Sequence, residues 1–299
     1  MSVKRKFVLG LILVFVFLIM AMGIWKIWPK NTPLNGDGRV SVVTSFYPLY
    51  YLTNEIGREK VEVKNLTPAG VEPHDYEPTA RDMVDIQQSK LLILNGGSLE
   101  TWGKKIKEDA KNVQVIEAGK DLFVGDDSHV WLSPRLAKEE AGNILAGLIQ
   151  ADRENESYYS ENAVILNQKL DKLQADYSRG LADCNRREIV TSHAAFGYLT
   201  REFGLTQVAI AGLSPDEEPS TKQMTEIAKF AKERQIKYIF FESLVSPKLA
   251  ETIAEEVGAK TLVLDPIEGI SDNDLMQGKN YLSIMEENLE NLRIALECR

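Results

Sequence analysis

The chain has 299 residues, of which 44% are hydrophobic and 26% are charged. This composition predicts a folded protein large enough for two ordinary domains and excludes an intrinsically disordered chain. The formal net charge is −9, and it becomes −14 without residues 1–30, which hold five of the 35 basic residues and none of the 44 acidic ones. An acidic surface repels nucleic acid, so we expect no nucleic-acid partner.

The first 30 residues differ from the rest of the chain. Three basic residues precede an apolar run over residues 7–24, and tryptophan and lysine side chains close the run. Such a run is just long enough to cross a bilayer, and its basic end should stay in the cytoplasm. We predict that residues 1–30 tether the protein to the extracytoplasmic face of the membrane and that the turn-rich residues 31–40 are a linker. A cleaved signal peptide is the alternative, because Ala21-Met22-Gly23 resembles a cleavage site, and the protein would then be secreted or periplasmic.

A sequence repeat divides the remaining chain into two similar halves. Residues 43–57 (VTSFYPLYYLTNEIG) align without a gap to residues 190–204 (VTSHAAFGYLTREFG), and eight of the fifteen positions are identical. Each copy is typical of a strand, a Thr-Ser turn and a helix that stops at glycine. We therefore predict an N-terminal lobe over residues 41–153 and a C-terminal lobe over residues 184–299.

Short apolar segments alternate with helical segments in both halves. This alternation predicts an α/β fold with a mostly parallel sheet in each lobe. Besides the strands that open the repeats, we expect strands at 61–63, 91–94, 113–116, 207–211, 238–241 and 261–264, and helices at 220–234 and 247–257.

A stripe of apolar side chains indicates how the lobes are joined. Leucines and a tyrosine recur at steps of three and four between Leu166 and Leu181, and no proline or glycine interrupts residues 154–179. This spacing predicts one continuous helix of about 25 residues, close to 40 Å long, inside the connecting segment 154–183. Such a helix would be a rigid strut between the lobes.

The chain has two cysteines, Cys184 and Cys298. Two cysteines in an exported chain are more often paired than free, so we expect a disulfide between them. They lack the close spacing of a metal-binding cysteine pair.

Two candidate metal ligands directly follow strands of the second half. His193 follows the strand expected at 188–191, and Asp265 follows the strand at 261–264. Ligands of open α/β sheets gather at the carboxyl ends of the strands, where both residues should lie. The first copy of the repeat has Phe46 in place of His193, so the histidine departs from the duplicated pattern.

The other two histidines of the chain lie in loops of the first half. His74 lies between two prolines, which leave its loop little entropy to lose on binding. His129 lies ahead of Ser133-Pro134, a pair typical of a helix start. The neighbouring Asp75 and Asp127 could each accept a hydrogen bond from the second ring nitrogen, as a metal-bound imidazole requires.

We predict that His74, His129, His193 and Asp265 share one metal ion. Three imidazoles and a carboxylate favour tetrahedral Zn²⁺, with Mn²⁺ as the alternative. A water molecule or Glu268 could replace Asp265 as the fourth ligand, and Glu242, at the end of the strand 238–241, could support the site or only pack. A membrane-anchored zinc hydrolase is disfavoured because the chain has neither an HExxH motif nor a serine-nucleophile motif, so we do not expect an enzyme.

These motifs resemble the cluster A-I substrate-binding proteins of ABC importers, which serve zinc and manganese. The resemblance covers nearly all of the chain after residue 40, and its segments are PHDYEP (73–78), HVWLSP (129–134), TSHAAFGY (191–198), FESLVSP (241–247) and LDPIEG (264–269). It implies two lobes joined by one rigid helix, with the metal in the cleft between them.

The resemblance also implies a ligand set and a partner. The family's ligand positions fall on His74, His129, His193 and Asp265, and a histidine rather than a glutamate at the third position favours zinc. The protein is then expected to be a monomer that captures the ion without chemistry and delivers it to an ABC permease in the membrane.

Overall fold

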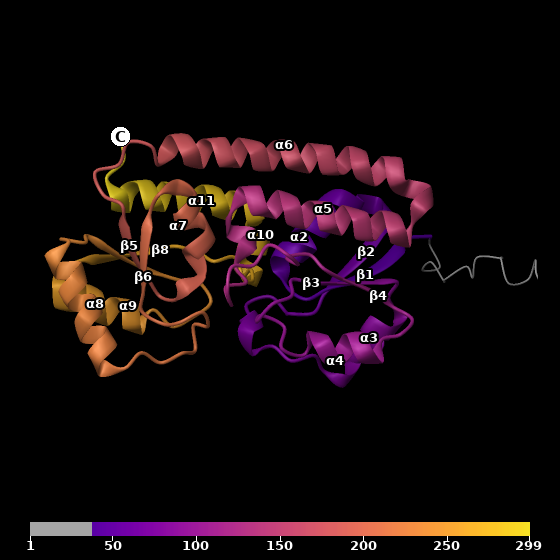
Figure 1. Cartoon of the computed structure of the whole chain (residues 1–299), viewed down its shortest axis with the longest axis horizontal. Coiled ribbons are helices and arrows are strands. Elements are labelled where there is room, and N and C mark those ends of the chain that lie inside the picture. The colour runs from indigo at the N-terminus through magenta and orange to yellow at the C-terminus, as the bar shows by residue number, and fades with distance from the viewer. Residues whose placement is uncertain (1–37) are drawn as a thin grey trace, which may run out of the picture. The chain divides into compact units, whose positions relative to one another are not determined.

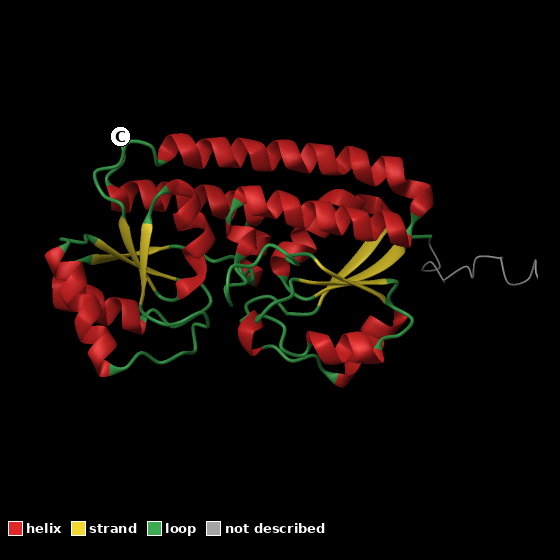
Figure 2. Cartoon of the chain, viewed as in Figure 1, coloured by secondary structure: helices red, strands yellow, loops and turns green. Residues whose placement is uncertain are grey.

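The computed structural model describes residues 38–299, which contain two four-stranded parallel sheets with helices on both faces of each (Figures 1 and 2). The predicted membrane anchor at 1–30 lies outside the described residues. Within residues 38–299 the structure contains no helix that is both long enough and apolar enough to span a membrane.

The first sheet has the order β2-β1-β3-β4. Its strands are β1 (Val40–Thr44), β2 (Val61–Asn65), β3 (Leu91–Leu94) and β4 (Gln114–Glu117). All neighbouring strands pair in parallel, with Val42 opposite both Val63 and Leu91. Every residue of β3 is buried, as expected for a strand covered on both faces.

The second sheet has the corresponding order β6-β5-β7-β8, again parallel throughout. Its strands are β5 (Glu188–Thr191), β6 (Thr206–Ala209), β7 (Tyr238–Phe241) and β8 (Lys260–Val263). In each sheet the strand that opens the repeat lies second from the edge, beside the strand that follows it in the chain. The predicted α/β fold with two related lobes is therefore confirmed.

Helices cover both sheets. They are α2 (Tyr47–Gly57), α3 (Ala80–Gln88), α4 (Gly103–Asp109), α5 (Pro134–Ala151), α6 (Glu156–Gly180), α7 (Gly197–Phe203), α8 (Thr221–Glu233), α9 (Lys248–Val257), α10 (Asp272–Met276) and α11 (Tyr281–Leu296). Helix α5 packs on the first sheet, and α11 packs on the second. The turns at which α7 and α9 end use Gly204 and Gly258 at positive φ, a conformation that glycine adopts without steric cost.

Helix α6 is the predicted strut. It is continuous over 25 residues and extends along both lobes in Figure 1. Its buried stripe includes Leu166, Leu170 and Tyr177, and it packs against α2, α5 and α11. These side chains belong to one hydrophobic core that contains residues of both lobes, so the lobes are held together by shared burial as well as by the chain.

The predicted disulfide between Cys184 and Cys298 is present. It joins the segment after α6 to the residues that follow α11, across 114 positions of sequence. The C-terminus is thereby fixed to the start of the second lobe.

Candidate metal centre

The two histidines of the first lobe lie in loops that follow its edge strands. His74 lies in a short 3-10 turn, Pro73–Asp75, between β2 and α3, and its backbone N–H donates to the Glu72 carboxylate. His129 lies between β4 and α5, just before the 3-10 turn Val130–Leu132. The Ser133 hydroxyl accepts from the Leu136 N–H at the start of α5, which confirms the predicted helix cap.

The second lobe contributes one histidine and one glutamate. His193 comes two residues after β5, at the carboxyl end of the sheet as predicted. Glu268 lies in the loop that follows β8. Both positions obey the rule that ligands of parallel sheets gather where the strands end.

The four side chains converge on one point between the lobes. The Nε2 atoms of His74, His129 and His193 lie 3.2, 3.0 and 3.3 Å from the same Glu268 oxygen, Oε1. All four candidate ligand atoms lie within 4.8 Å of one another. Adjacent ligands of a tetrahedral zinc ion are about 3.3 Å apart, given Zn–N and Zn–O bonds of about 2.0–2.1 Å. The arrangement therefore has the size of a zinc coordination shell.

Burial separates the four side chains from water to different degrees. The side chains of His129, His193 and Glu268 are at most 1% exposed, whereas His74 retains 9%. The second carboxylate oxygen of Glu268 is buried and has no hydrogen-bond partner in the described part of the chain. A buried carboxylate oxygen without a partner is costly, and a bound cation would compensate for that cost.

Two further carboxylates orient two of the imidazoles. Asp127 lies 2.9 Å from Nδ1 of His129, and Glu242 lies 2.7 Å from Nδ1 of His193. A proton on Nδ1 that is donated to a carboxylate leaves the Nε2 lone pair free to bind a metal. Each carboxylate also accepts from the backbone N–H of the same histidine, which holds it in place.

Charges inside the site shift the pKa values of its members. Burial alone would lower the pKa of His193, but Glu268 and Glu242 outweigh this effect and hold it well above the usual value. Burial likewise opposes the charge on His129, yet Asp127 and Glu268 raise its pKa. Burial would raise the pKa of Glu268, but the histidines hold it well below the usual value. In the metal-free protein these interactions favour the ionised form of Glu268 and the protonated forms of His129 and His193.

Asp265 lies outside this set. Its carboxylate accepts from the Ser243 hydroxyl and, at 2.7 Å, from the Ile267 backbone N–H, while Asn288 bonds its backbone. These hydrogen bonds hold the turn that leads to Glu268. The residue pattern favours Asp265 because it directly follows the strand expected at 261–264, and Glu268 is the alternative.

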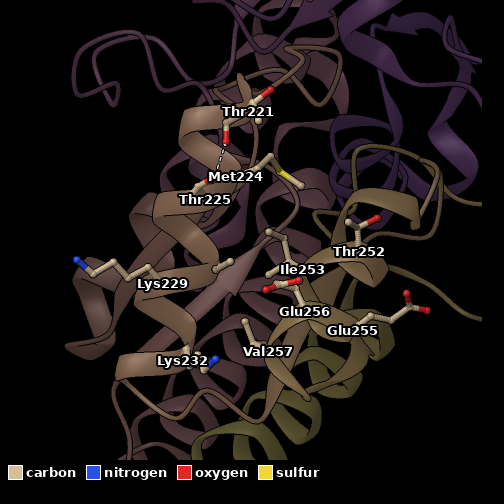
Figure 3. Close-up of a pocket in the computed structure, with 11 residues that line it drawn as sticks. Thr221, Met224, Thr225, Lys229, Lys232, Thr252, Ile253, Glu255, Glu256 and Val257 are labelled. Carbon is tan, nitrogen blue, oxygen red and sulfur yellow. Dashed lines mark hydrogen bonds between the residues drawn. The ribbon is translucent and has the colours of Figure 1, made fainter.

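One groove of the described chain is separate from the histidines. It has a volume of about 700 Å³ and runs between α8 and α9, with Met224, Ile253 and Val257 among its lining residues (Figure 3). None of its lining residues belongs to the histidine–glutamate set. The compact, polar centre between the lobes has the chemistry of an ion site, and this groove does not.

Comparison with known proteins places the chain among zinc-uptake proteins. A family model described as zinc-uptake complex component A, periplasmic, matches residues 42–295. The high-affinity zinc uptake system protein ZnuA of Bacillus subtilis is 39% identical over 283 residues, which are 87% of this chain and 88% of that protein.

Two further relatives come from Streptococcus pneumoniae. Its zinc-binding lipoprotein AdcA is 37% identical over 86% of this chain, but the chain spans only 56% of that protein's length. The crystal structure of the Zn(II)-bound ZnuA-like domain of AdcA is 37% identical, with a TM-score of 0.79 over 87% of this chain and 100% of that domain. The chain thus belongs to the ZnuA family of zinc-binding substrate-binding proteins of ABC transporters, which are binding proteins and not enzymes.

Proposed function

We propose that this protein captures one zinc ion between its lobes through His74, His129, His193 and Glu268 and delivers it to an ABC permease. The observation that carries the proposal is the convergence of three Nε2 atoms on one Glu268 oxygen at 3.0–3.3 Å. Family membership supports zinc as the cargo.

The chemistry of the donor atoms supports zinc over manganese. Three imidazole nitrogens and one carboxylate suit Zn²⁺, whereas Mn²⁺ prefers a shell richer in oxygen. Four protein ligands also fill a tetrahedron, while a catalytic zinc site keeps one position open for water or substrate. The full shell therefore favours capture of the ion over hydrolysis.

The partner and the location are part of the proposal. A substrate-binding protein of an ABC importer works outside the cytoplasm and docks on the permease, and we infer the same for this chain as a monomer. The disulfide between Cys184 and Cys298 supports an oxidising compartment, and a Streptococcus pneumoniae relative is named a lipoprotein. We infer an N-terminal membrane tether from the residue pattern at 1–30.

The proposed domain organisation restricts how far the lobes can separate. We propose lobes at 41–153 and 184–299 with a connecting segment at 154–183. Helix α6 shares its buried face with both lobes, so a wide hinge motion would expose core side chains. Zinc capture would then use small adjustments of the loops around His74 and Glu268.

Calorimetric titration of the metal-free protein tests the proposal and its ligand set. We expect one equivalent of tightly bound Zn²⁺ that Mn²⁺ does not displace. Glu268→Gln should weaken zinc binding about 100-fold or more, because it removes a charged ligand, whereas Asp265→Asn should cost about tenfold or less.

Three results would count against the proposal. No bound zinc in the unaltered protein would refute metal capture. Tight manganese with weak zinc would replace the cargo. A larger loss from Asp265→Asn than from Glu268→Gln would return the fourth ligand to Asp265.

A further inference from the structure

One hydroxyl group of the second lobe is bonded twice to the loop that precedes His129. The Tyr198 hydroxyl, from α7, donates to the backbone carbonyl of Asp127 and accepts from the backbone N–H of Val124, each at 2.7 Å. The Tyr198 ring is 5% exposed and packs against Val130 and Leu136 of the first lobe. This side chain therefore inserts into the first lobe and fixes the path of its loop.

The same helix also encloses the Asp127 side chain. The Arg201 guanidinium lies 3.8 Å from Oδ2 of Asp127 and stacks on the Tyr198 ring, 4.6 Å from its centroid. A Cβ atom at Gly197 would lie 2.6 Å from that same oxygen, far inside van der Waals contact. Oδ2 of Asp127 is thus confined by α7, and a side chain at Gly197 would displace it.

The other oxygen of Asp127 connects this contact to the proposed metal ligand. Oδ1 of Asp127 accepts from both the backbone N–H and Nδ1 of His129, at 3.1 and 2.9 Å. A carboxylate in this place fixes the tautomer and the ring orientation of an imidazole ligand and raises its basicity. The chain of contacts runs from Tyr198 through Asp127 to the Nε2 atom of His129 that faces Glu268.

We propose that Tyr198 is a positioning residue for zinc binding, which acts from the second lobe on a ligand of the first. Its hydroxyl holds the Val124–Asp127 loop so that the Asp127 carboxylate meets His129. Separation of the lobes would break both hydroxyl bonds and release Asp127. The strength with which His129 binds the zinc ion then depends on contact between the lobes. This inference rests on the proposed zinc site.

Tyr198→Phe tests the role of the hydroxyl, because it keeps the ring and its packing. We expect zinc affinity to fall about tenfold, at the low end of the 10–100-fold loss typical when a residue behind a metal ligand is changed. The matched control is Tyr159→Phe, which removes a hydroxyl bonded to Asp152 at 2.7 Å, among residues that line no part of the metal centre. The control should change zinc affinity less than twofold.

Imidazole NMR distinguishes positioning from a general loss of structure. The chain has three histidines, so ¹⁵N-histidine spectra of the zinc-loaded protein contain three imidazole sets. Tyr198→Phe should shift the His129 signals and leave those of His193 unchanged. Gly197→Ala, which displaces Asp127 while Tyr198 remains, should shift the same His129 signals and carries the test if Tyr198→Phe does not fold.

The outcomes separate this inference from the proposed function. If the unaltered protein binds zinc and Tyr198→Phe matches Tyr159→Phe in affinity and spectra, the positioning role is refuted and the zinc site stands. If all three imidazole sets shift together, Tyr198 is only structural. If the unaltered protein binds no zinc, both proposals fail.

Discussion

The two lobes have the same strand order but contribute their candidate metal ligands from partly different positions. His129 follows β4 and Glu268 follows β8, the last strand of each sheet, so these two residues occupy corresponding places. The other two do not correspond. The two lobes thus share the ligand position after the last strand, and each adds one ligand from a position that the other lobe does not use.

The clearest difference lies directly after the strands that open the repeat. The first lobe has Phe46, which is fully buried and contacts Trp131 edge-on at a ring distance of 4.7 Å. The second lobe has His193, which is equally buried but bonds Glu242 and faces Glu268. The same backbone position serves packing in one lobe and the proposed ion binding in the other.

The loop after the edge strand shows the reverse assignment. Glu77-Pro78-Thr79 of the first lobe corresponds to Glu218-Pro219-Ser220 of the second, and Thr79 caps α3 as Ser220 caps α8. Ser220 is the N-cap of α8, where its hydroxyl accepts from the Gln223 N–H. The first lobe carries His74 in the loop ahead of this shared helix start, and the second lobe has no histidine between β6 and α8.

Among the expected effects on zinc binding, the largest should come from a change at His193. His193→Ala removes one of three nitrogen donors and leaves Glu242 without its partner, so we expect zinc affinity to fall about 1,000-fold, beyond the 10–100-fold typical of residues behind the ligands. Competition with a chelator of known zinc affinity measures the change.

The reciprocal change provides the control. Phe46→His should leave no new zinc site, because Phe46 packs on Trp131 in the core, and it should lower the free energy of unfolding by about 3–5 kcal/mol. Chemical denaturation of the metal-free protein measures this loss. A second equivalent of zinc in Phe46→His, or unchanged zinc affinity in His193→Ala, would contradict the proposal that this position packs in the first lobe and binds the ion in the second.

The fold was largely predictable because its signals are local. The uninterrupted stripe from Leu166 to Tyr177 predicted α6, and the repeat at 43–57 and 190–204 predicted two related sheets. The strand order was not predicted, since it depends on packing between segments distant in the chain. The cap at Ser133 was predictable because Ser followed by Pro has a direct physical meaning at a helix start.

The metal centre was predictable only in part, for a physical reason. The histidines stand out because the chain has three and each lies in a loop. The choice between Asp265 and Glu268 depends on the turn between them. Ile267 there adopts φ +56, an uncommon conformation for a β-branched residue, which is held by the Asp265 carboxylate and by burial. Residue patterns do not predict such a turn.

The pH dependence of zinc binding should reveal one titrating imidazole from each lobe. The pKa of His193 is held well above its usual value and that of His129 is raised, so in the metal-free protein both imidazoles bind protons more tightly than an ordinary histidine. Zinc must displace these protons. Binding is therefore strong at high pH, and it weakens by up to about 100-fold per pH unit as pH falls through the two raised values, beginning above 6.5.

Calorimetry in buffers of different ionisation enthalpy counts the protons. We expect zinc binding at pH 7 to release protons, and to release fewer in His193→Ala if any binding remains. The metal-free protein should show the opposite trend. A raised histidine pKa stabilises the fold fully below about pH 6.5, and this contribution is lost as pH rises through the folded-state values. Zinc affinity independent of pH between 6 and 9 would refute the raised pKa values.

The smallest expected effect concerns corresponding helices of the two lobes, α5 and α11. Glu140 of α5 is fully buried, and neither of its carboxyl oxygens has a hydrogen-bond partner within residues 38–299. Burial, with a contribution from the charge of Glu100, raises the pKa of Glu140 well above its usual value. The residue 147 positions further on, Glu287 of α11, is exposed and lies 2.8 Å from Lys279.

Because the pKa of Glu140 is higher in the folded than in the unfolded chain, folding at neutral pH requires uptake of a proton. That cost grows as pH rises above about 4.3. Glu140→Gln keeps the shape and removes the titration, so we expect it to raise the free energy of unfolding by about 1–3 kcal/mol at pH 7 and to change it little at pH 4. Glu287→Gln breaks only a solvated ion pair and should change stability by less than about 0.5 kcal/mol. Urea unfolding of both variants at the two pH values decides the matter, and a loss of stability in Glu140→Gln at pH 7 would show that the buried carboxylate has a partner that compensates its charge.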